Sequence, residues 1–362
     1  MDYKEILKEQ FHNVVDLDQI DEISKETYEL SEGLSESFSL EKILESTLNG
    51  ESFFHNQELI SGIKDLALYE IRNAMILGVE ILIICVVIGP LKNLSASFGS
   101  KSMSDISMLV CTMVIIGISM NSFRIVYQLA LDSVSVMVST MEILTPILLG
   151  IMISTGAVTS GSILSPVIIG SVTGFGVILK KIILPALFVA TILGLINCLT
   201  EKDYVNKLGK LIRNASLIVT GLIIAVLTGI ITIQGLITET SDSLLMSAAK
   251  YSLSTFIPIV GGFTSDTIEL FLRCMGTIKN VVGVFAVITL VLIVVVPLIK
   301  ILIIALIYKL TAAVTEPVSE SKISDGLNEM GSCLISMASI MFFCALLFIM
   351  FVSIILRIGG NA

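Results

Sequence analysis

The sequence FIPIVGGFTSDTIELF at residues 256–271 places two carboxylates in the most hydrophobic half of the chain. Asp266, Glu269 and Arg273 are spaced so that a helix would bring them to one face, and Glu269 and Arg273 could form an ion pair. Ionisable groups at membrane depth typically serve a pathway or a protein interface. An amphipathic helix at the membrane surface explains the pattern equally well, so both interpretations stay open.

Glu80 is a further candidate, since it lies in the apolar sequence AMILGVEILIICVV. A carboxylate buried there would be protonated or paired and could relay protons. However, Glu80 lies only about two helical turns from the start of this run, which favours an interfacial position. The candidate pathway or interface residues are therefore Glu80, Pro258, Gly261, Gly262, Asp266, Glu269 and Arg273.

Residues 146–176 read PILLGIMISTGAVTSGSILSPVIIGSVTGFG and carry no charge. Gly170 and Gly174 have the spacing of a helix-packing face, and small residues are common at such interfaces. We interpret 146–179 and 258–275 as hairpins or re-entrant segments, whose backbone must be buried in protein or line a cavity. The expected packing residues of the first hairpin are Pro146, Gly150, Gly170 and Gly174.

No group of residues predicts catalysis, a cofactor or a metal site. His12 and His55 lie in a polar segment, and the HExxH, P-loop and GxSxG patterns are absent from the sequence. The six cysteines are scattered singly without CxxC spacing, which indicates buried thiols rather than a disulfide framework or a zinc site. We expect a protein that is not an enzyme and that binds no cofactor.

The composition predicts an all-α, polytopic membrane protein. The chain is 54% hydrophobic and 15% charged, whereas soluble domains carry about 25% charged residues. Several apolar runs exceed the ~20 residues that a helix needs to cross a bilayer. The predicted spans are 74–91, 107–126, 182–199, 215–237, 282–311 and 332–356, with helix kinks at Pro185 and Pro297.

The charge is divided unevenly along the chain. Residues 1–72 contain 17 Asp and Glu against six Lys and Arg, whereas the remainder is close to neutral. Such an acidic segment is repelled by anionic lipid and by nucleic acid. We therefore expect an acidic helical extramembrane arm over 1–72, packed loosely on itself or on a partner, and a membrane domain over 73–362 that contacts the lipid bilayer and no nucleic acid.

Orientation is predicted from Lys and Arg in short loops. Loops 92–105 and 201–214 are basic and should be cytoplasmic, which puts the arm and the C-terminus outside. Loop 315–331 is acidic and fits this scheme poorly. The opening MDYKEILKEQ has no signal-peptide pattern, so an external arm implies a signal upstream of Met1 or already removed. The residues expected to anchor span ends are Lys180, Lys181, Lys300 and Lys309.

A shift of 112 residues indicates an internal repeat, with repeat 1 at about 106–214 and repeat 2 at about 215–331. The last span, 332–356, would begin a truncated third copy. Both copies would enter the membrane from the same side, as parallel repeats. The residues that recur in register are Gly117 with Gly229, Pro146 with Pro258, Gly150 with Gly262, and Pro185 with Pro297.

Extended segments within 258–330 resemble the stage III sporulation protein AE family of endospore-forming bacteria. They read PIVGGFTSDTIE, KNVVGVFAVITL and PLIKILIIALIYKLTAAVTEP. The resemblance implies a multi-pass protein of the mother-cell membrane around the forespore, with its N-terminal arm extracytoplasmic. It also implies membership of a secretion-like channel complex, whose partners include other stage III membrane proteins, ring-forming components and a secretion-type ATPase.

Two functions stay open. In the first, the chain is a channel subunit whose hairpins pack against neighbouring membrane proteins and whose arm binds a partner. In the second, it is a stand-alone permease for a small molecule or ion, in which two parallel repeats enclose the path and Glu80, Asp266 and Glu269 bind the substrate. The uncharged first hairpin weakens the permease, because repeat-built sites usually draw polar groups from both halves.

Overall fold

The computed structural model describes residues 17–30, 101–199, 205–256, 261–317 and 321–358, together with parts of 68–84. Within the long helices, the side chains of 236–271 lie outside the described part. All regular structure in the described residues is helical, which confirms the all-α prediction. The elements are α2 (Leu17–Leu30), α5 (Lys101–Ser154), α6 (Val158–Ile178), the π-helix η3 (Leu179–Ile183), α7 (Leu184–Cys198), α8 (Asn206–Phe256), α9 (Gly261–Thr315) and α10 (Ser321–Arg357).

Among the described residues, five helical segments are long and apolar enough to cross a membrane. This agrees with the polytopic prediction, and the predicted spans from 215 onward lie within α8, α9 and α10. A shorter apolar helix, Ala74–Ile84, covers part of the first predicted span. The five long segments are Thr112–Ser154, Val158–Cys198, Asn206–Gly235, Leu272–Thr315 and Lys322–Arg357.

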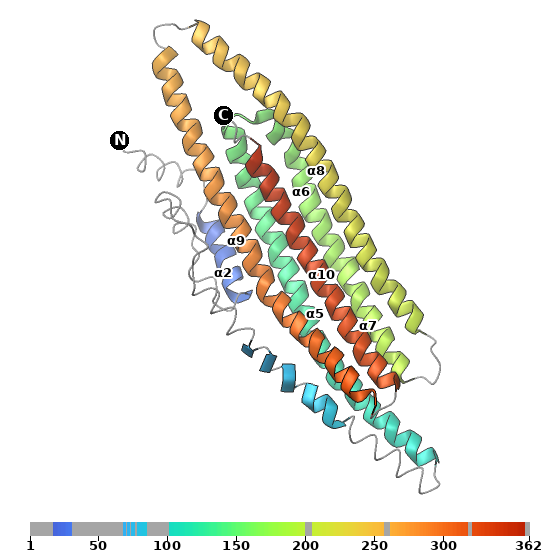
Figure 1. Ribbon diagram of the computed structural model, residues 1–362. Coiled ribbons are helices and arrows are strands. Elements are labelled where there is room, and N and C mark those ends of the chain that lie inside the picture. Colours follow the sequence, from blue (N-terminus) through green and yellow to red (C-terminus); the bar gives the residue numbers. More distant parts are fainter. Residues whose placement is uncertain are drawn as a thin grey trace.

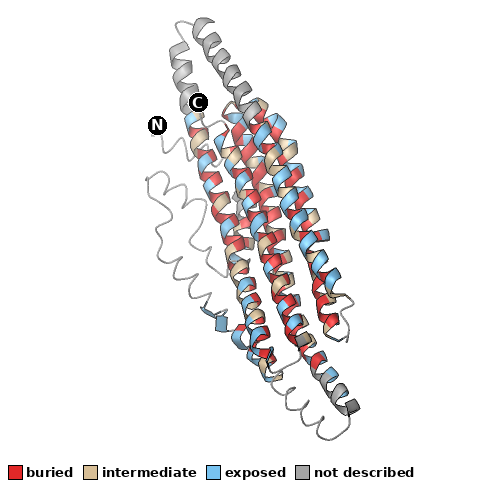
Figure 2. Ribbon diagram, turned by 45° about the vertical axis from the view of Figure 1, so that its right-hand side comes forward, coloured by how far each residue is buried: buried red, intermediate tan, exposed pale blue. Residues whose placement is uncertain are grey.

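The long helices form an antiparallel bundle around α10 (Figure 1). Helix α10 packs against α5, α7, α8 and α9, and its Cys344, Phe348 and Phe351 are fully buried. Buried residues concentrate in the middle of the bundle (Figure 2). The acidic helix α2 contacts α5 and α9 and buries Ile23. This part of the N-terminal segment therefore packs on the membrane body, while the predicted extramembrane arm is otherwise untested.

The hairpin predicted within 146–179 is a helical one, because Pro146 lies inside α5 and the chain turns after Ser154 into α6. Gly156 has a φ of 97° at this turn, a conformation that glycine adopts without a Cβ clash. The apolar faces of α5 and α6 pack on the bundle, so tertiary contacts outweigh the weak helix propensity of Pro and Gly. Non-helical backbone is confined to the turn between α5 and α6, where Thr155, Gly156 and Ala157 each donate a backbone hydrogen bond to α5.

Helices α6, η3 and α7 continue one another as a rod of 41 residues, Val158–Cys198. At 1.5 Å per residue the rod is about 60 Å long, twice the ~30 Å of a bilayer core. Lys180 and Lys181 lie near its middle, and their role as anchors of a span end stays a prediction. They belong to η3, which directly precedes Pro185. A proline lacks the N–H that would continue the α-helical ladder, which explains why the irregular turn lies there.

The second predicted hairpin, 258–275, is also largely helical, because α9 already begins at Gly261. Pro258 lies outside the described residues. Pro297, a predicted kink, lies inside the single helix α9. The 112-residue repeat and the domain boundaries stay predictions.

The helix order brings the start of α5, the end of α7, the start of α8, the end of α9 and the start of α10 to one end of the bundle (Figure 1). The basic segments 92–105 and 201–214 were expected on one side of the membrane, and this arrangement agrees with that. The acidic segment 315–331 reaches the same end. Large parts of the two predicted loops 201–214 and 315–331 are helical. Lys207, Lys210 and Arg213 belong to α8, and Asp325 and Glu329 belong to α10.

Candidate functional site at the start of α10

The first turns of α10 are held by polar side chains from three neighbouring helices, an arrangement we call the α10 joint. From α7, the Cys198 thiol donates to the Lys322 carbonyl at 3.2 Å. From α9, Lys309 Nζ donates to Asn328 Oδ1 at 3.3 Å and to Ser332 Oγ at 3.1 Å. On the same side, the Ser324 hydroxyl donates to the Ala312 carbonyl of α9 at 2.8 Å.

An ion pair from α8 completes the α10 joint. Arg213 Nη1 donates to Glu329 Oε1, and the two side chains are only 16% and 11% exposed. Because both charges are largely out of water, removal of one partner would leave the other buried and uncompensated. This pair also explains why the acidic segment 315–331 fits the loop-charge scheme poorly. The Glu329 carboxylate of this acidic segment is neutralised by Arg213 of the basic segment 201–214.

Glycines allow the helices of the α10 joint to approach closely. A Cβ on Gly326 would collide with the Cys198 sulfur. A Cβ on Gly194 would lie 3.1 Å from Glu329 Cγ, and one on Gly209 would lie 3.1 Å from the Ala190 carbonyl oxygen. The small residues bring the polar groups of α7, α8 and α10 within hydrogen-bonding reach.

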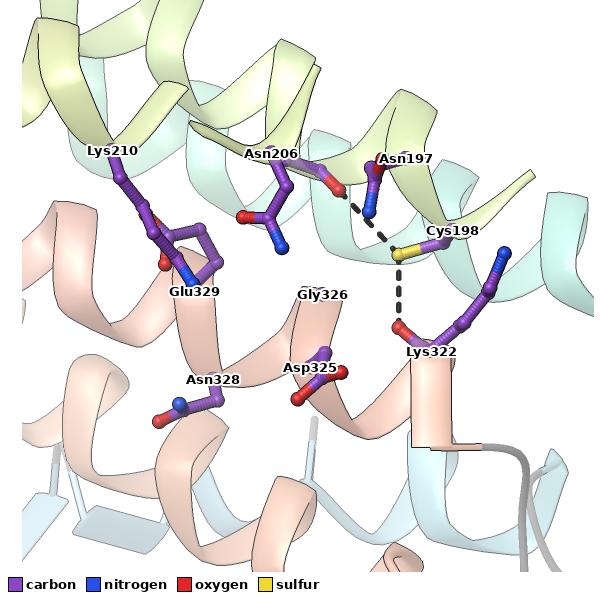
Figure 3. A pocket seen from close by; sticks show the side chains of 10 residues that line it. Asn197, Cys198, Asn206, Lys210, Lys322, Asp325, Gly326, Asn328 and Glu329 are labelled. Carbon is purple, nitrogen blue, oxygen red and sulfur yellow. Dashed lines mark hydrogen bonds between the residues drawn. The ribbon is translucent and has the colours of Figure 1, made fainter. Parts of the chain in front are cut away.

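A small polar pocket of about 40 Å³ lies within the α10 joint. A buried water needs roughly 10–15 Å³, so the pocket has room for about three waters. Positively charged and negatively charged side chains and three asparagine amides surround this space (Figure 3). The lining residues are Gly194, Asn197, Cys198, Asn206, Lys210, Lys322, Asp325, Gly326, Asn328 and Glu329.

The polar groups of the α10 joint hold the helices in position. The Cys198 thiol is engaged by backbone carbonyls, with the Gly194 oxygen at 3.6 Å as its second acceptor. In the part of the chain that the structure describes, no three His, Cys, Asp or Glu side chains come together as metal ligands. Paired charges, amides and glycines instead fix how α10 enters the bundle.

The candidate stripe Asp266, Glu269 and Arg273 lies on α9 near its start at Gly261, so its backbone is helical as the spacing predicted. The side chains of Asp266, Glu269 and Gly262 lie outside the described residues, and Arg273 is exposed. Whether the stripe borders a pathway or an interface therefore stays a prediction.

Glu80 is exposed, while its neighbours Ala74 and Ile81 are buried. A Cβ on Gly78 would lie 2.7 Å from Ile307 Cγ2. The short helix Ala74–Ile84 therefore packs on α9 close to Lys309 of the α10 joint. Glu80 thus points away from the bundle near one of its ends. This position agrees with the interfacial interpretation and not with a buried proton relay inside the chain.

The predicted packing glycines contact no other helix in the part of the chain that the structure describes. Gly150, Gly170 and Gly174 are exposed, and a Cβ at each would meet no atom within 4 Å. Contacts with another subunit stay a prediction for these positions. Close helix packing in this region is made instead by Gly161 against Ile153 and by Gly176 against Val138.

Sequence reasoning missed two polar contacts that link distant segments. One is the Arg213–Glu329 pair, which complementary charge in 201–214 and 315–331 could have indicated. The other is Lys279 of α9, which is 1% exposed and donates to the Ile358 carbonyl at 2.7 Å. A cation at the end of α10 stabilises the helix dipole, but a lone lysine gives no sequence signal for that role.

Comparisons with known proteins give one consistent result. The sequence model of a family described as stage III sporulation protein AE matches residues 38–359. A protein of Bacillus subtilis (strain 168) named Stage III sporulation protein AE is 27% identical over 316 residues, which cover 86% of this chain and 78% of that protein. Among solved structures, none matches this chain.

Proposed function

Because the chain belongs to the stage III sporulation protein AE family, we propose that it is a membrane component of the channel between mother cell and forespore. This channel would be a secretion-like complex required for endospore formation. The family match assigns the chain to sporulation, and the five long apolar helices of the described region fit a multi-pass membrane protein. The combination of these two observations carries the proposal.

The proposed location is the mother-cell membrane around the forespore. The basic segments 92–105 and 201–214 favour a cytoplasmic position for the end of the bundle that carries the α10 joint. A secretion-type ATPase would then approach this end. Ring-forming components would approach the opposite side, where the N-terminal arm is expected.

The α10 joint supports a structural role. It fixes the central helix by contacts from α7, α8 and α9, as expected for a subunit that presents stable outer faces to partners. The permease alternative places substrate at Glu80, Asp266 and Glu269. Glu80 lies exposed near one bundle end, which gives this alternative no support.

The proposal is tested by isolating a tagged chain from sporulating cells with mild detergent and crosslinking. Recovery of a secretion-type ATPase together with ring-forming membrane proteins is the expected result. Recovery of the chain alone, as a defined homo-oligomer, would contradict the channel and favour the permease.

A variant with Asp266→Asn and Glu269→Gln separates the two functions further. The channel subunit tolerates these substitutions if the carboxylates lie at the membrane surface, and spores then form at the parental frequency. A permease that binds its substrate at these residues loses flux, and spore formation falls although the chain still reaches the membrane in normal amount.

A further inference from the structure

Helix α5 carries a line of polar side chains on its outer face, which we call the α5 stripe. Its members are spaced by three or four residues, so they share one side of the helix. The charged members and Gln128 are exposed, and the two serines are half-buried. Opposite them, Phe123, Ala130 and Met137 are fully buried. The α5 stripe consists of Arg124, Gln128, Asp132, Ser135, Ser139 and Glu142.

Contacts with the neighbouring rod extend this polar face. Thr173 of α6 donates to Glu142 Oε1 at 2.9 Å, and Lys180 of η3 donates to Ser135 Oγ at 3.3 Å. Lys181, the next residue of η3, is exposed. A π-turn inside an α-helix often marks a functional site, and here it presents two lysines beside the α5 stripe.

The α5 stripe lies at membrane depth. Thr173 and Lys180, which bond to the stripe, flank Phe175, whose ring packs edge-on against Phe348 at a centroid distance of 6.5 Å. Phe348 belongs to the run 330–356 of the central helix, which contains no Asp, Glu, Lys or Arg. A helix segment that is apolar over this length marks the hydrocarbon core. Ser135 and Glu142 are therefore level with the interior of the bilayer.

Lipid does not fit against this face. Charged side chains in membrane segments almost always face a bundle interior or a water-filled cavity, yet the bundle of this chain places them outside. A dry protein interface is also a poor environment, since each charge there would need a partner. In the described part of the chain, Arg124, Asp132 and Lys181 form no ion pair. Water would satisfy the charges and hydrogen-bonding groups that the protein leaves unpaired on this face.

We propose that the α5 stripe, together with Lys181, lines a water-filled path closed by further copies of this chain. The proposal rests on the proposed function and names the surface that would border the channel. Copies arranged around an axis along the membrane normal bring the same groups to the same depth. Rings of Asp132 and Lys181 carry opposite charge at neighbouring levels, so the path suits hydrophilic solutes of either sign rather than one type of ion.

Thiol labelling tests this path. Gln128→Cys and Ser139→Cys place a thiol on the α5 stripe, and Val226→Cys places one on α8, where Val226 is 50% exposed. Val226 lies between Arg213, which binds Glu329 at one end of the charge-free run, and Gly235, which approaches Ile354 and Ile358 at the other. The control therefore shares the membrane depth of the stripe. Each variant is made in the parent chain, whose six native cysteines set the background.

Membranes from sporulating cells are treated with a charged, membrane-impermeant maleimide, and labelling in denaturant reports the total thiol. We expect labelling at least tenfold faster at Gln128→Cys and Ser139→Cys than at Val226→Cys. A bifunctional thiol crosslinker should also join two copies of the Ser139→Cys variant across the path.

Slow labelling at both stripe positions overturns the water-filled path and indicates a dry interface. Fast labelling without the crosslink overturns closure by further copies. In either case, co-isolation of the secretion-type ATPase with the same variants would show that the proposed function stands. Loss of that ATPase from the parent chain itself would instead overturn the proposed function.

Discussion

The outer faces of α5 and α8 have opposite chemistry, although both helices lie at the periphery of one bundle. Along α8 between Ala215 and Ile231, the exposed side chains are apolar, and Thr220 and Ser216 are turned inward and buried. Along α5 between Arg124 and Glu142, every apolar side chain except Ile125 is buried or half-buried, and Gln128, Asp132 and Glu142 are exposed. The large exposed apolar residues in the described part of α8 are Leu208, Leu211, Ile218, Val219, Leu222, Val226, Ile230 and Ile233.

This difference shows that helices of similar length need not share one environment. The apolar outer face of α8 suits lipid, because it exposes no charge between Ile218 and Ile233. The outer face of α5 suits water or a polar partner. Average hydropathy identifies both as membrane helices, but only the direction of each side chain distinguishes their surroundings.

The largest expected effect concerns the inner side of α8. Arg213→Met leaves Glu329 buried without its cation, and we expect a loss of about 3–5 kcal/mol of stability. Thermal unfolding in mild detergent measures the change. The double variant Arg213→Met with Glu329→Leu should recover most of the loss, because no unpaired charge then remains. An unaltered single variant would contradict the structural role of the α10 joint.

A charge placed on each outer face tests the comparison itself. Val226→Asp puts a carboxylate against lipid at membrane depth, at a cost of about 2.5–3.5 kcal/mol. Ser139→Asp adds the same charge to the α5 stripe, where water should accommodate it. The steady-state amount of each variant in the membrane fraction is measured by quantitative immunoblot. Equal losses for the two variants would mean that α5 and α8 face the same medium.

Replacing each of two glycines by alanine compares a closely packed position with an open position on the helix surface. Gly326→Ala forces a methyl group onto the Cys198 sulfur, and we expect a loss of about 1–3 kcal/mol from overpacking. Gly174→Ala adds the same methyl group where no atom lies within 4 Å, so the unfolding midpoint should stay constant or rise slightly, because alanine favours helix. Equal midpoints for the two variants would contradict the close approach of α7 and α10.

The smallest effect on stability is expected for Asp132→Asn. This side chain is exposed and accepts a hydrogen bond from Gln128 of its own helix at 2.9 Å. Exposed substitutions of this kind change stability by about 0.5 kcal/mol or less. The unfolding midpoint in detergent checks this value, and a loss comparable with that of Gly326→Ala would show that Asp132 is buried in the folded protein.

Much of the membrane body could be predicted from the sequence, for a physical reason. The runs in α8, α9 and α10 are apolar around most of each helix, so length and hydropathy suffice to find them. Within segment 146–179 the sequence indicated a chain reversal but not how much of it is helix, because Pro and Gly resemble loop residues in isolation, although packing keeps the backbone helical. Lys180 and Lys181 suggested a span end, and the sequence did not show that α6, η3 and α7 form one continuous rod around them.

The α10 joint and the α5 stripe were harder to predict, for different reasons. Arg213 and Glu329 are separated by 116 positions, so only the fold reveals that they meet. The α5 stripe is local and recurs at helical spacing from Arg124 to Glu142. Its pattern was available in the sequence, but periodicity alone does not say whether a polar face points into a bundle or away from it.

The most direct test of this account is a cryo-EM reconstruction of the complex isolated from sporulating cells. The account predicts several copies of the chain around a common axis, with the α5 stripe and Lys181 facing a hydrated lumen and the apolar face of α8 against lipid or detergent. A reconstruction with the α5 stripe buried in the detergent belt, or with the outer face of α8 next to the lumen, would contradict it.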